Sequence, residues 1–311
     1  MNESKKIDFV FFGSSRLSVI VLDELLKIGQ KPALIITTRD KPQGRKLEIK
    51  PNVVKEWAIK NDVSVLSPAK LDSAFIEQLK KWPIESLRID HWPLFIVASY
   101  GKIIPNEIIE MPLHKTLNIH PSLLPKYRGA SPLPTAMLDD SKATGISIMQ
   151  LDREMDHGPI VAQRQINLLD HFPDWPTYED FEEMMAKEGT KLLAEIMPDW
   201  VSGKIKAKDQ DHSLATYTKK IAKEDGKVDF TTEQLKDLAQ IPSQKAYEIF
   251  RKIQAFHEWP VAYFLIDHAG NIMRVKITQA SFENKKLNIQ KVTPEGRKEI
   301  SFKDFVAGYI K

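Results

Sequence analysis

The 311-residue chain contains no cysteine. This absence excludes disulfides, zinc sites with thiolate ligands, iron–sulfur clusters and cysteine nucleophiles, and it fits a reducing compartment. No stretch approaches the roughly 18 consecutive apolar residues that a membrane span needs. Lys5 and Lys6 lead directly into a short apolar segment without a small-residue cleavage site, so the sequence indicates neither secretion nor membrane insertion. We therefore expect a soluble, cytoplasmic protein.

Sequence motifs for common cofactors and metals are also missing. The turn Gly13-Ser14-Ser15 lacks the G-x-G-x-x-G spacing of a dinucleotide site, and no Walker sequence occurs. The eight histidines include no H-E-x-x-H or comparable ligand spacing, so metal catalysis is not indicated. The chain also has no internal repeat and no low-complexity tract.

The net charge of +3 conceals a difference between the two parts of the chain. Residues 1–203 carry 25 Lys and Arg against 28 Asp and Glu, whereas residues 204–311 carry 20 against 14. The balance is therefore −3 in the first part and +6 in the second. This asymmetry favours a polyanionic partner for the C-terminal part, and the alternative is an ordinary solvated basic surface.

In the first two hundred residues, short apolar runs typical of strands alternate with segments whose apolar residues recur at helical spacing. This alternation predicts an α/β fold. We expect buried strands over 7–12, 33–37, 63–66, 94–99 and 115–119, with helices between them. Such a Rossmann-like, mainly parallel sheet places ligand sites in the loops at the carboxyl ends of its strands. Residues 144–151 and 160–168 alternate apolar and polar residues, which indicates antiparallel additions before a long helix over 177–201.

The C-terminal part has a different pattern. Residues 204–227 are polar and Lys-rich with little periodicity, which is typical of a linker. After a helix over 243–253, short strands are expected over 262–266, 273–277, 287–289 and 299–302. The sequence therefore predicts an α/β domain over 1–203, a linker over 204–227 and a smaller OB-like β-barrel domain over 228–311.

The densest cluster of candidate site residues follows the strand over 115–119. Asn118 and His120 are two residues apart, so both side chains leave the strand on one face at its carboxyl end. An amide can donate hydrogen bonds to an oxyanion, and an imidazole can move protons near neutral pH, so the pair suits acyl transfer. The alternative is that His120 is a satisfied core histidine and Asn118 an edge polar residue.

A second candidate site is the acidic loop between the two alternating segments. It contains Asp152, Glu154 and Asp156, followed by His157. A buried carboxylate beside an imidazole fixes the tautomer of the ring and supports its charge, and we assign this role to Asp156. Asp152 and Glu154 are interpreted as ordinary turn residues, and His157 as a loop residue.

These residues together form a known pattern. Asn118-Ile119-His120, followed by Pro121-Ser122-Leu123-Leu124-Pro125, Tyr127-Arg128-Gly129-Ala130 and later Asp156, resembles the folate-dependent formyltransferases. Within them the chain is similar to the methionyl-tRNA formyltransferases, because further matches cover nearly its whole length: residues 40–45, 98–105, 215–217, 220–224 and 254–260.

The resemblance implies a formyl group carried by 10-formyltetrahydrofolate and delivered to the α-amino group of initiator methionyl-tRNA by a metal-free monomer. It implies a catalytic role for Asn118, His120 and Asp156. A folate pocket would be lined by Ser122, Leu123, Leu124 and Pro125. Arg45, in the polar loop over 39–51, would contact the tRNA, and the basic barrel would hold the acceptor stem.

Two alternatives remain open on the sequence alone. A nucleotide-sugar N-formyltransferase would share the folate donor and the three catalytic residues. A scaffold without activity would require a broken catalytic set. The chain also departs from the family pattern in four places: the turn 13–16, a short loop over 39–51, an insertion over 82–92, and His157 where the family prefers threonine. These departures affect the expected tRNA contacts more than the expected formyl chemistry.

Overall fold

The computed structural model describes residues 7–43, 48–82, 92–141, 143–172 and 174–310. The chain divides into two compact units, and each is interrupted in sequence by the other. Unit 1 comprises Met1–Ala130, Ala143–Ile166 and Glu182–Tyr217. Unit 2 comprises Ser131–Lys142, Asn167–Phe181 and Thr218–Lys311.

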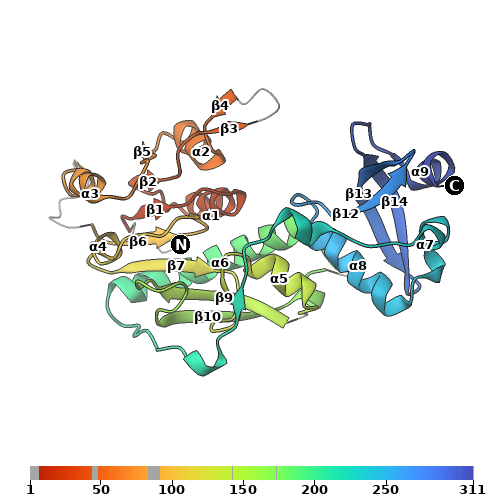
Figure 1. Cartoon of the computed structure of the whole chain (residues 1–311). Coiled ribbons are helices and arrows are strands. Elements are labelled where there is room, and N and C mark those ends of the chain that lie inside the picture. The colour runs from red at the N-terminus through yellow and green to blue at the C-terminus, as the bar shows by residue number, and fades with distance from the viewer. Residues whose placement is uncertain (1–6, 44–47, 83–91, 142, 173, 311) are drawn as a thin grey trace. The chain divides into compact units, whose positions relative to one another are not determined.

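Unit 1 is built on a seven-stranded sheet with the order β10-β9-β7-β6-β1-β2-β5 (Figure 1). The pairs β1–β2, β1–β6, β2–β5 and β6–β7 are parallel, while β9 runs antiparallel to β7. The strands are β1 (Val10–Phe12), β2 (Leu34–Ile36), β5 (Val65–Leu66), β6 (Phe95–Val97), β7 (Thr116–His120), β9 (Ala143–Gln150) and β10 (Ile160–Asn167). The predicted mainly parallel α/β sheet is confirmed.

Helices cover both faces of this sheet. On one face, alternate residues of β1, β2 and β6 share a buried cluster with α3 (Ser73–Lys80) and α4 (Asn106–Ile109). On the other face, Gly189 of the long helix α6 (Tyr178–Val201) lies directly against Ile119 and Ile146 of β7 and β9. Helix α1 (Arg16–Lys27) follows β1 after the turn at Gly13, and the side chain of Ser15 accepts a hydrogen bond from the backbone of Ser18 at its N-terminus.

The segment expected as a polar loop over 39–51 contains two short paired strands, β3 (Lys41–Gln43) and β4 (Glu48–Lys50). Arg45 lies outside the described residues, as does most of the predicted insertion, residues 83–91. Helix α2 (Val53–Lys60) follows, and its first amides are bonded by the side chain of Asn52.

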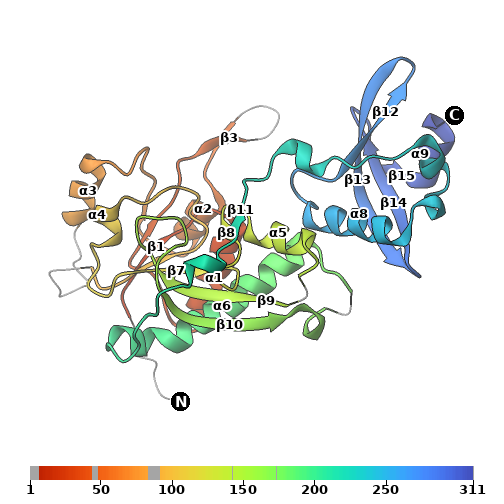
Figure 2. The ribbon, with the colours of Figure 1, turned by 60° about the horizontal axis from the view of Figure 1, so that its bottom comes forward.

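Two short strands that are distant in the sequence form a small sheet of their own. Strand β8 (Arg128–Gly129) pairs with β11 (Tyr217–Thr218), so these segments lie side by side in Figure 2. The segment before β11, including a 3₁₀ turn over His212–Leu214, therefore belongs to unit 1. The remainder of the expected linker, from Thr218, belongs to unit 2. The proposed domain boundaries at 203 and 227 stay a prediction.

Unit 2 contains a four-stranded antiparallel sheet with the order β12-β13-β14-β15. Each overlaps one of the four short strands expected from the sequence, although β13 and β14 are longer than expected: β12 (Tyr263–His268), β13 (Asn271–Glu283), β14 (Lys286–Pro294) and β15 (Ile300–Ser301). Its helices are α5 (Pro132–Leu138), α7 (Thr232–Lys236), α8 (Ser243–Ala255) and α9 (Phe302–Tyr309).

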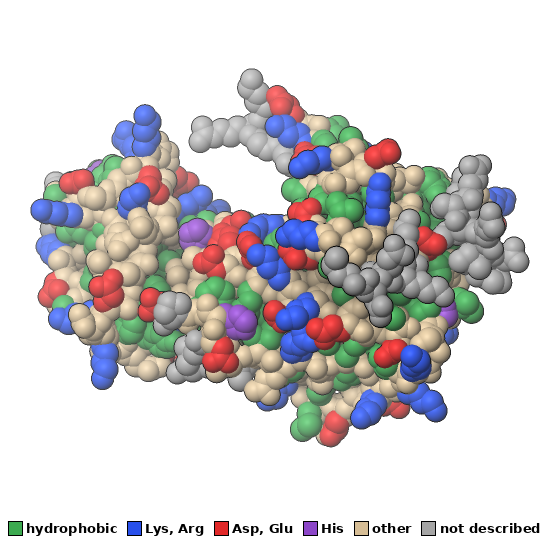
Figure 3. Space-filling model, turned by 180° about the vertical axis from the view of Figure 1, so that it is seen from behind, with side chains coloured by type: hydrophobic (Ala, Val, Ile, Leu, Met, Phe, Trp, Pro, Cys, Tyr) green, Lys and Arg blue, Asp and Glu red, His purple; other side chains and the backbone are tan. Residues whose placement is uncertain are grey.

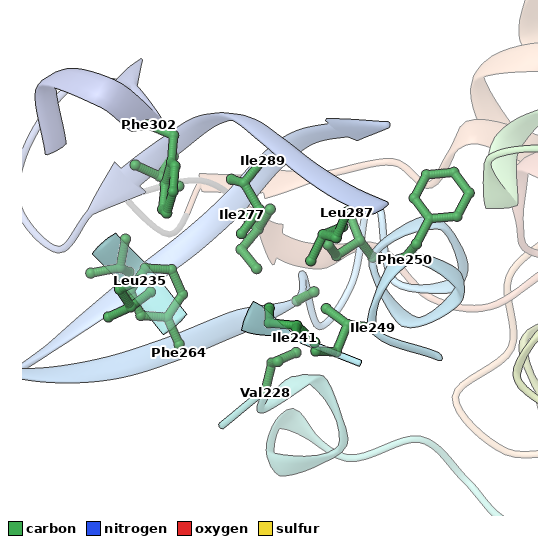
Figure 4. Close-up of a cluster of buried hydrophobic side chains, with 14 of the residues drawn as sticks. Val228, Leu235, Ile241, Ile249, Phe250, Phe264, Ile277, Leu287, Ile289 and Phe302 are labelled. Carbon is green, nitrogen blue, oxygen red and sulfur yellow. The ribbon is translucent and has the colours of Figure 1, made fainter. Parts of the chain in front are cut away.

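The core of unit 2 forms where α8 packs on β13 and β14. Side chains such as Ile249, Phe264, Ile277 and Ile289 converge there (Figure 4). Helix α8 contributes to this core because its apolar residues recur at helical spacing along one face. The unit thus has a hydrophobic core of its own.

Within the part of the chain that the structure describes, no helix is both long enough and apolar enough to span a bilayer.

Candidate active site

Strand β7 carries two polar side chains into the interior of unit 1. Every residue of β7 is buried, because the strand lies between β6 and β9. Asn118 and His120 are 9% and 4% exposed, and their spacing of two residues puts them on one face of the sheet. They sit at the carboxyl end of a parallel strand, as the sequence predicts, where α/β folds bind ligands.

Both ring nitrogens of His120 face oxygen acceptors. Nδ1 lies 3.5 Å from Oδ1 of Asp156, and Nε2 lies 3.1 Å from the carbonyl oxygen of Tyr127. An imidazolium can donate from both nitrogens, whereas a neutral imidazole can donate from only one. The two oxygens therefore orient the ring between Asp156 and the Tyr127 carbonyl.

Asp156 lies in the loop between β9 and β10 and has a left-handed backbone, with φ of +51°. Its Oδ2 accepts a 2.7 Å hydrogen bond from the backbone N–H of Gly129. The other oxygen, Oδ1, is the one nearest His120. The structure thus brings together the histidine and the carboxylate that the sequence singled out.

The segment after β7 is fastened to the sheet through the hydroxyl of Ser147. Ser147 Oγ donates to the carbonyl of Ser122 at 2.7 Å and accepts from the backbone N–H of Leu124 at 3.0 Å. Gln163 Nε2 donates both to Ser147 Oγ and to the carbonyl of Leu124, each at 2.8 Å. Ser122, buried itself, donates from Oγ to the carbonyl of Lys126. Leu123 and Pro125 are half-buried in the same segment, which forms a fixed wall next to the catalytic candidates.

Comparison with known proteins identifies the family of the chain. The model of the formyl transferase family matches residues 5–197. A methionyl-tRNA formyltransferase of Sulfurihydrogenibium sp. (strain YO3AOP1) is 35% identical over 275 residues, covering 88% of this chain and 81% of the relative. The methionyl-tRNA formyltransferase of Dictyoglomus turgidum is 34% identical over 320 residues, covering 96% of each. The chain belongs to the methionyl-tRNA formyltransferase family.

Solved structures show the same fold at low sequence identity. Methionyl-tRNA formyltransferase from Clostridium thermocellum aligns with a TM-score of 0.57 at 16% identity, covering 95% of this chain and 99% of that one. An N-formyltransferase from Helicobacter canadensis, solved with folinic acid and dTDP-3-aminofucose, aligns with a TM-score of 0.59 at 16% identity, covering 89% of each chain. The fold is thus common to methionyl-tRNA and sugar formyltransferases.

The position after Asp156, where this methionyl-tRNA formyltransferase family member has histidine, takes part in a small network. Nδ1 of His157 lies 2.7 Å from Oδ2 of Asp152, and its ring stacks on that of His212 with centroids 4.0 Å apart. Asp152 also accepts from the backbone N–H of Glu154 at 2.9 Å, as expected of a turn residue. The sequence interpretation of His157 as a plain loop residue missed its stacking partner.

Sequence reasoning also missed the roles of Arg128 and Gln210. Arg128 is 1% exposed, and its guanidinium donates to the side-chain oxygen of Gln210. Gln210 in turn donates to the backbone carbonyls of Asp156 and Gly158. Arg128 belongs to the motif that carried the resemblance, but Gln210 lies in the polar segment expected as a linker. No local pattern could have found this pair, since it joins residues 82 positions apart.

Tyr100 follows β6 at the same edge of the sheet. It is 2% exposed and packs edge-on against Phe12. Burial raises the pKa of its hydroxyl to about 12, so Tyr100 stays protonated at any physiological pH. Among the described residues, no group of three or more His, Asp or Glu side chains is arranged to hold a metal ion.

Proposed function

We propose that this chain transfers the formyl group of 10-formyltetrahydrofolate to the α-amino group of initiator methionyl-tRNA. The observation that carries the proposal is the His120–Asp156 pair beside Asn118, in a chain that is 30–36% identical to methionyl-tRNA formyltransferases along most of its length. The catalytic set is Asn118, His120 and Asp156.

In the proposed reaction the neutral amine of the methionyl group attacks the formyl carbon, and the carbonyl π-electrons move onto oxygen. Asn118 and protonated His120 donate hydrogen bonds to that oxyanion. When the oxyanion collapses, the bond between the formyl carbon and N10 of the folate breaks. The proton lost by the amine reaches N10, so the products are formylmethionyl-tRNA and tetrahydrofolate. Donors aimed at a developing oxyanion are among the largest contributions to such catalysis.

Asp156 supports the charge on His120 in this scheme. Its carboxylate faces Nδ1 and leaves Nε2 for proton transfer, after the ring exchanges its contact with the Tyr127 carbonyl for substrate. A buried carboxylate placed in this way fixes the orientation of the ring and stabilises the imidazolium.

The wall formed by Ser122, Leu123, Leu124 and Pro125 is proposed to line the folate pocket. Its backbone is fixed by Ser147 and Gln163, so the half-buried side chains of Leu123 and Pro125 can contact a pterin or its linker without further ordering. The formyl donor enters as a cosubstrate, and the proposal needs no metal.

We assign tRNA binding to Arg45 and to the basic C-terminal domain over 228–311. Several lysines of residues 204–311 are paired with acids, including Lys227 with Asp229 and Lys291 with Glu299. Cationic and anionic side chains also lie interspersed over the face seen in Figure 3. The positive balance of residues 204–311 supplies the attraction to phosphates, and Arg45 is assigned to the acceptor end of the tRNA.

The alternative acceptor is an amino sugar linked to a nucleotide. The structural likeness to the Helicobacter canadensis enzyme favours it only at the level of the fold. Transfer of radiolabelled formyl from the folate donor should be measured with initiator methionyl-tRNA and with a dTDP-amino sugar in parallel. Labelling of the tRNA alone supports the proposal, and labelling of the sugar alone overturns it. We also expect a monomer, which light scattering measures directly.

A further inference from the structure

The side-chain amide of Gln210 connects a buried arginine to the loop that carries Asp156. Gln210 is 6% exposed. Its Oε1 accepts from Nη2 of Arg128 at 2.7 Å and from Nε at 3.2 Å. Its Nε2 donates to the carbonyl of Asp156 at 2.9 Å and to that of Gly158 at 2.7 Å. All four contacts lie within unit 1.

The chemistry of Arg128 determines which way this amide points. A guanidinium carries only N–H donors, so the group facing it must be an acceptor. Oxygen of Gln210 therefore faces Arg128, and both hydrogens of the NH₂ group are directed to the two loop carbonyls. With these four contacts, the hydrogen-bonding capacity of the amide is fully used.

The chain segments that contain Arg128 and Gln210 also hold Asp156, one through its side chain and the other through its backbone. Gly129, the neighbour of Arg128, donates its N–H to Oδ2 of the carboxylate, while Gln210 donates to the carbonyl of the same residue. These bonds hold a residue whose left-handed φ of +51° is uncommon for a residue with a Cβ. Oδ1 is then directed at Nδ1 of His120.

We propose that Arg128 and Gln210 are positioning residues that hold the Asp156 carboxylate against His120. The inference rests on the proposed function and adds two residues to its machinery. Neither side chain needs to touch a substrate, because both act through the backbone of the Asp156 loop. Displacement of a catalytic group by about 1 Å can cost on the order of 10²-fold in rate.

Other charged and titratable groups border this network. Nδ1 of His212 lies 2.8 Å from Nη2 of Arg128, and the ring stacks on His157, which is paired with Asp152. The guanidinium also lies 5.9 Å from the ring of Tyr217. A test based on pH must therefore follow the His120 signal itself rather than activity alone.

The first experiment compares Gln210→Ala with Gln30→Ala in the full chain. Gln30 is the matched control, since it is also a buried amide of unit 1 that accepts a backbone bond, from Ile7 N at 3.1 Å, but it lies at the amino-terminal end of β1. We expect Gln210→Ala to lower kcat by about 10²-fold with a small change in KM for the folate. Its His120 imidazole NMR signals should titrate at lower pH than in the wild type. The control should leave both unchanged.

A double-mutant cycle with Asp156→Asn separates positioning from a general structural role. If Gln210 acts through the carboxylate, Gln210→Ala should cost little further turnover once that charge is gone. Multiplicative losses in the double variant, or an unchanged His120 titration in Gln210→Ala, would overturn the proposal. If Gln210→Ala does not fold, Gln210→Met keeps the volume of the side chain and should give the same shift.

The NMR titration needs no substrate, so it distinguishes this inference from the proposed function. A wild-type chain that formylates no methionyl-tRNA contradicts the proposed function. A His120 titration shifted in the Gln210→Ala variant relative to that wild-type chain would still support the positioning role of Gln210.

Discussion

Nδ1 of His120 and Oδ1 of Asp156 lie 3.5 Å apart, although one belongs to a parallel strand and the other to the loop that follows an antiparallel one. The contact exists because β9 lies beside β7 in the sheet, with Ser147 opposite His120 in the register. Because β9 runs antiparallel to β7, Gln150 at its end lies opposite Leu117, and the loop that follows must reach back to bring Asp156 to His120.

Removal of either oxyanion donor should abolish most of the activity. We expect Asn118→Ala and His120→Ala each to lower turnover by about 10²- to 10³-fold, since each removes a group that acts in the transition state. Formyl transfer to methionyl-tRNA measures the effect, circular dichroism checks the fold, and His171→Ala at an exposed position serves as the control. Near-native turnover in both variants would contradict the assignment of the catalytic site to these residues.

Asp156→Asn should keep the shape of the loop and lose the charge beside His120. The remaining side-chain oxygen can still accept from Gly129, so the fold should survive. We expect lower turnover and a shifted pH profile of kcat/KM, because the imidazolium loses its counter-charge. A folded variant with an unchanged profile contradicts the assignment of Asp156.

Binding of tRNA should weaken steeply with added salt, with a slope near −0.9 per phosphate contact to duplex, whereas folate binding should change far less. Arg45→Ala should lower turnover more than overall tRNA affinity, because we assign it to positioning the acceptor end. Filter binding over a range of salt concentrations, together with turnover, measures both. Salt-insensitive tRNA binding is the result that the proposal does not allow.

Tyr100 should make the protein sensitive to alkali. Burial raises the pKa of this hydroxyl from 10.0 to about 12, so the folded state holds its proton where the unfolded chain releases it. The free energy of unfolding should then fall by up to about 1.4 kcal/mol per pH unit as pH rises from 10 towards 12. Below pH 10 the hydroxyl keeps its proton in both states, so Tyr100 causes no loss of stability there.

Tyr100→Phe removes the titrating group and should therefore be more stable than the wild type above pH 10. Near pH 7 it should be at least as stable, since the hydroxyl has no hydrogen-bond partner among the described residues. Urea unfolding at pH 7 and pH 10.5 tests both statements. Equal destabilisation of the variant at the two pH values would show that the hydroxyl is satisfied in solution.

Gly158 should not tolerate a side chain. A Cβ at this position would collide with the carbonyl oxygen of Gln150, whereas a Cβ at Gly308 in α9 meets no atom within 4 Å. We expect Gly158→Ala to lower the melting temperature and the formylation rate together, because the Asp156 loop must move. Gly308→Ala should preserve both, and thermal unfolding compares the two variants.

Elements with strong hydrophobic patterns could be predicted from the sequence. The strand that ends at His120 and the four C-terminal strands were expected near their observed positions, because buried runs bounded by turn residues are local signals. Helix α9 and the β3–β4 pair were not predicted. Asn118, His120 and Asp156 were predicted as site residues because their residue types and spacing are typical of a catalytic site.

Gln210 could not be found in this way. Its partners Arg128 and Asp156 are distant in sequence, and its own surroundings are polar and aperiodic. In such a segment, the sequence does not distinguish a buried glutamine from a solvated one, because only tertiary contacts bury it. Contacts of this kind depend on the whole fold rather than on a local pattern.

The hydroxyl of Ser147 has one proton and two lone pairs, and the contacts with Ser122, Leu124 and Gln163 use all three. The wall over residues 122–125 is consequently ordered before any ligand arrives. Folate binding should then show little loss of chain entropy, and its heat-capacity change should reflect the buried area of the ligand alone. Specificity for the formyl donor would come from the fixed shape of this wall rather than from folding around the ligand.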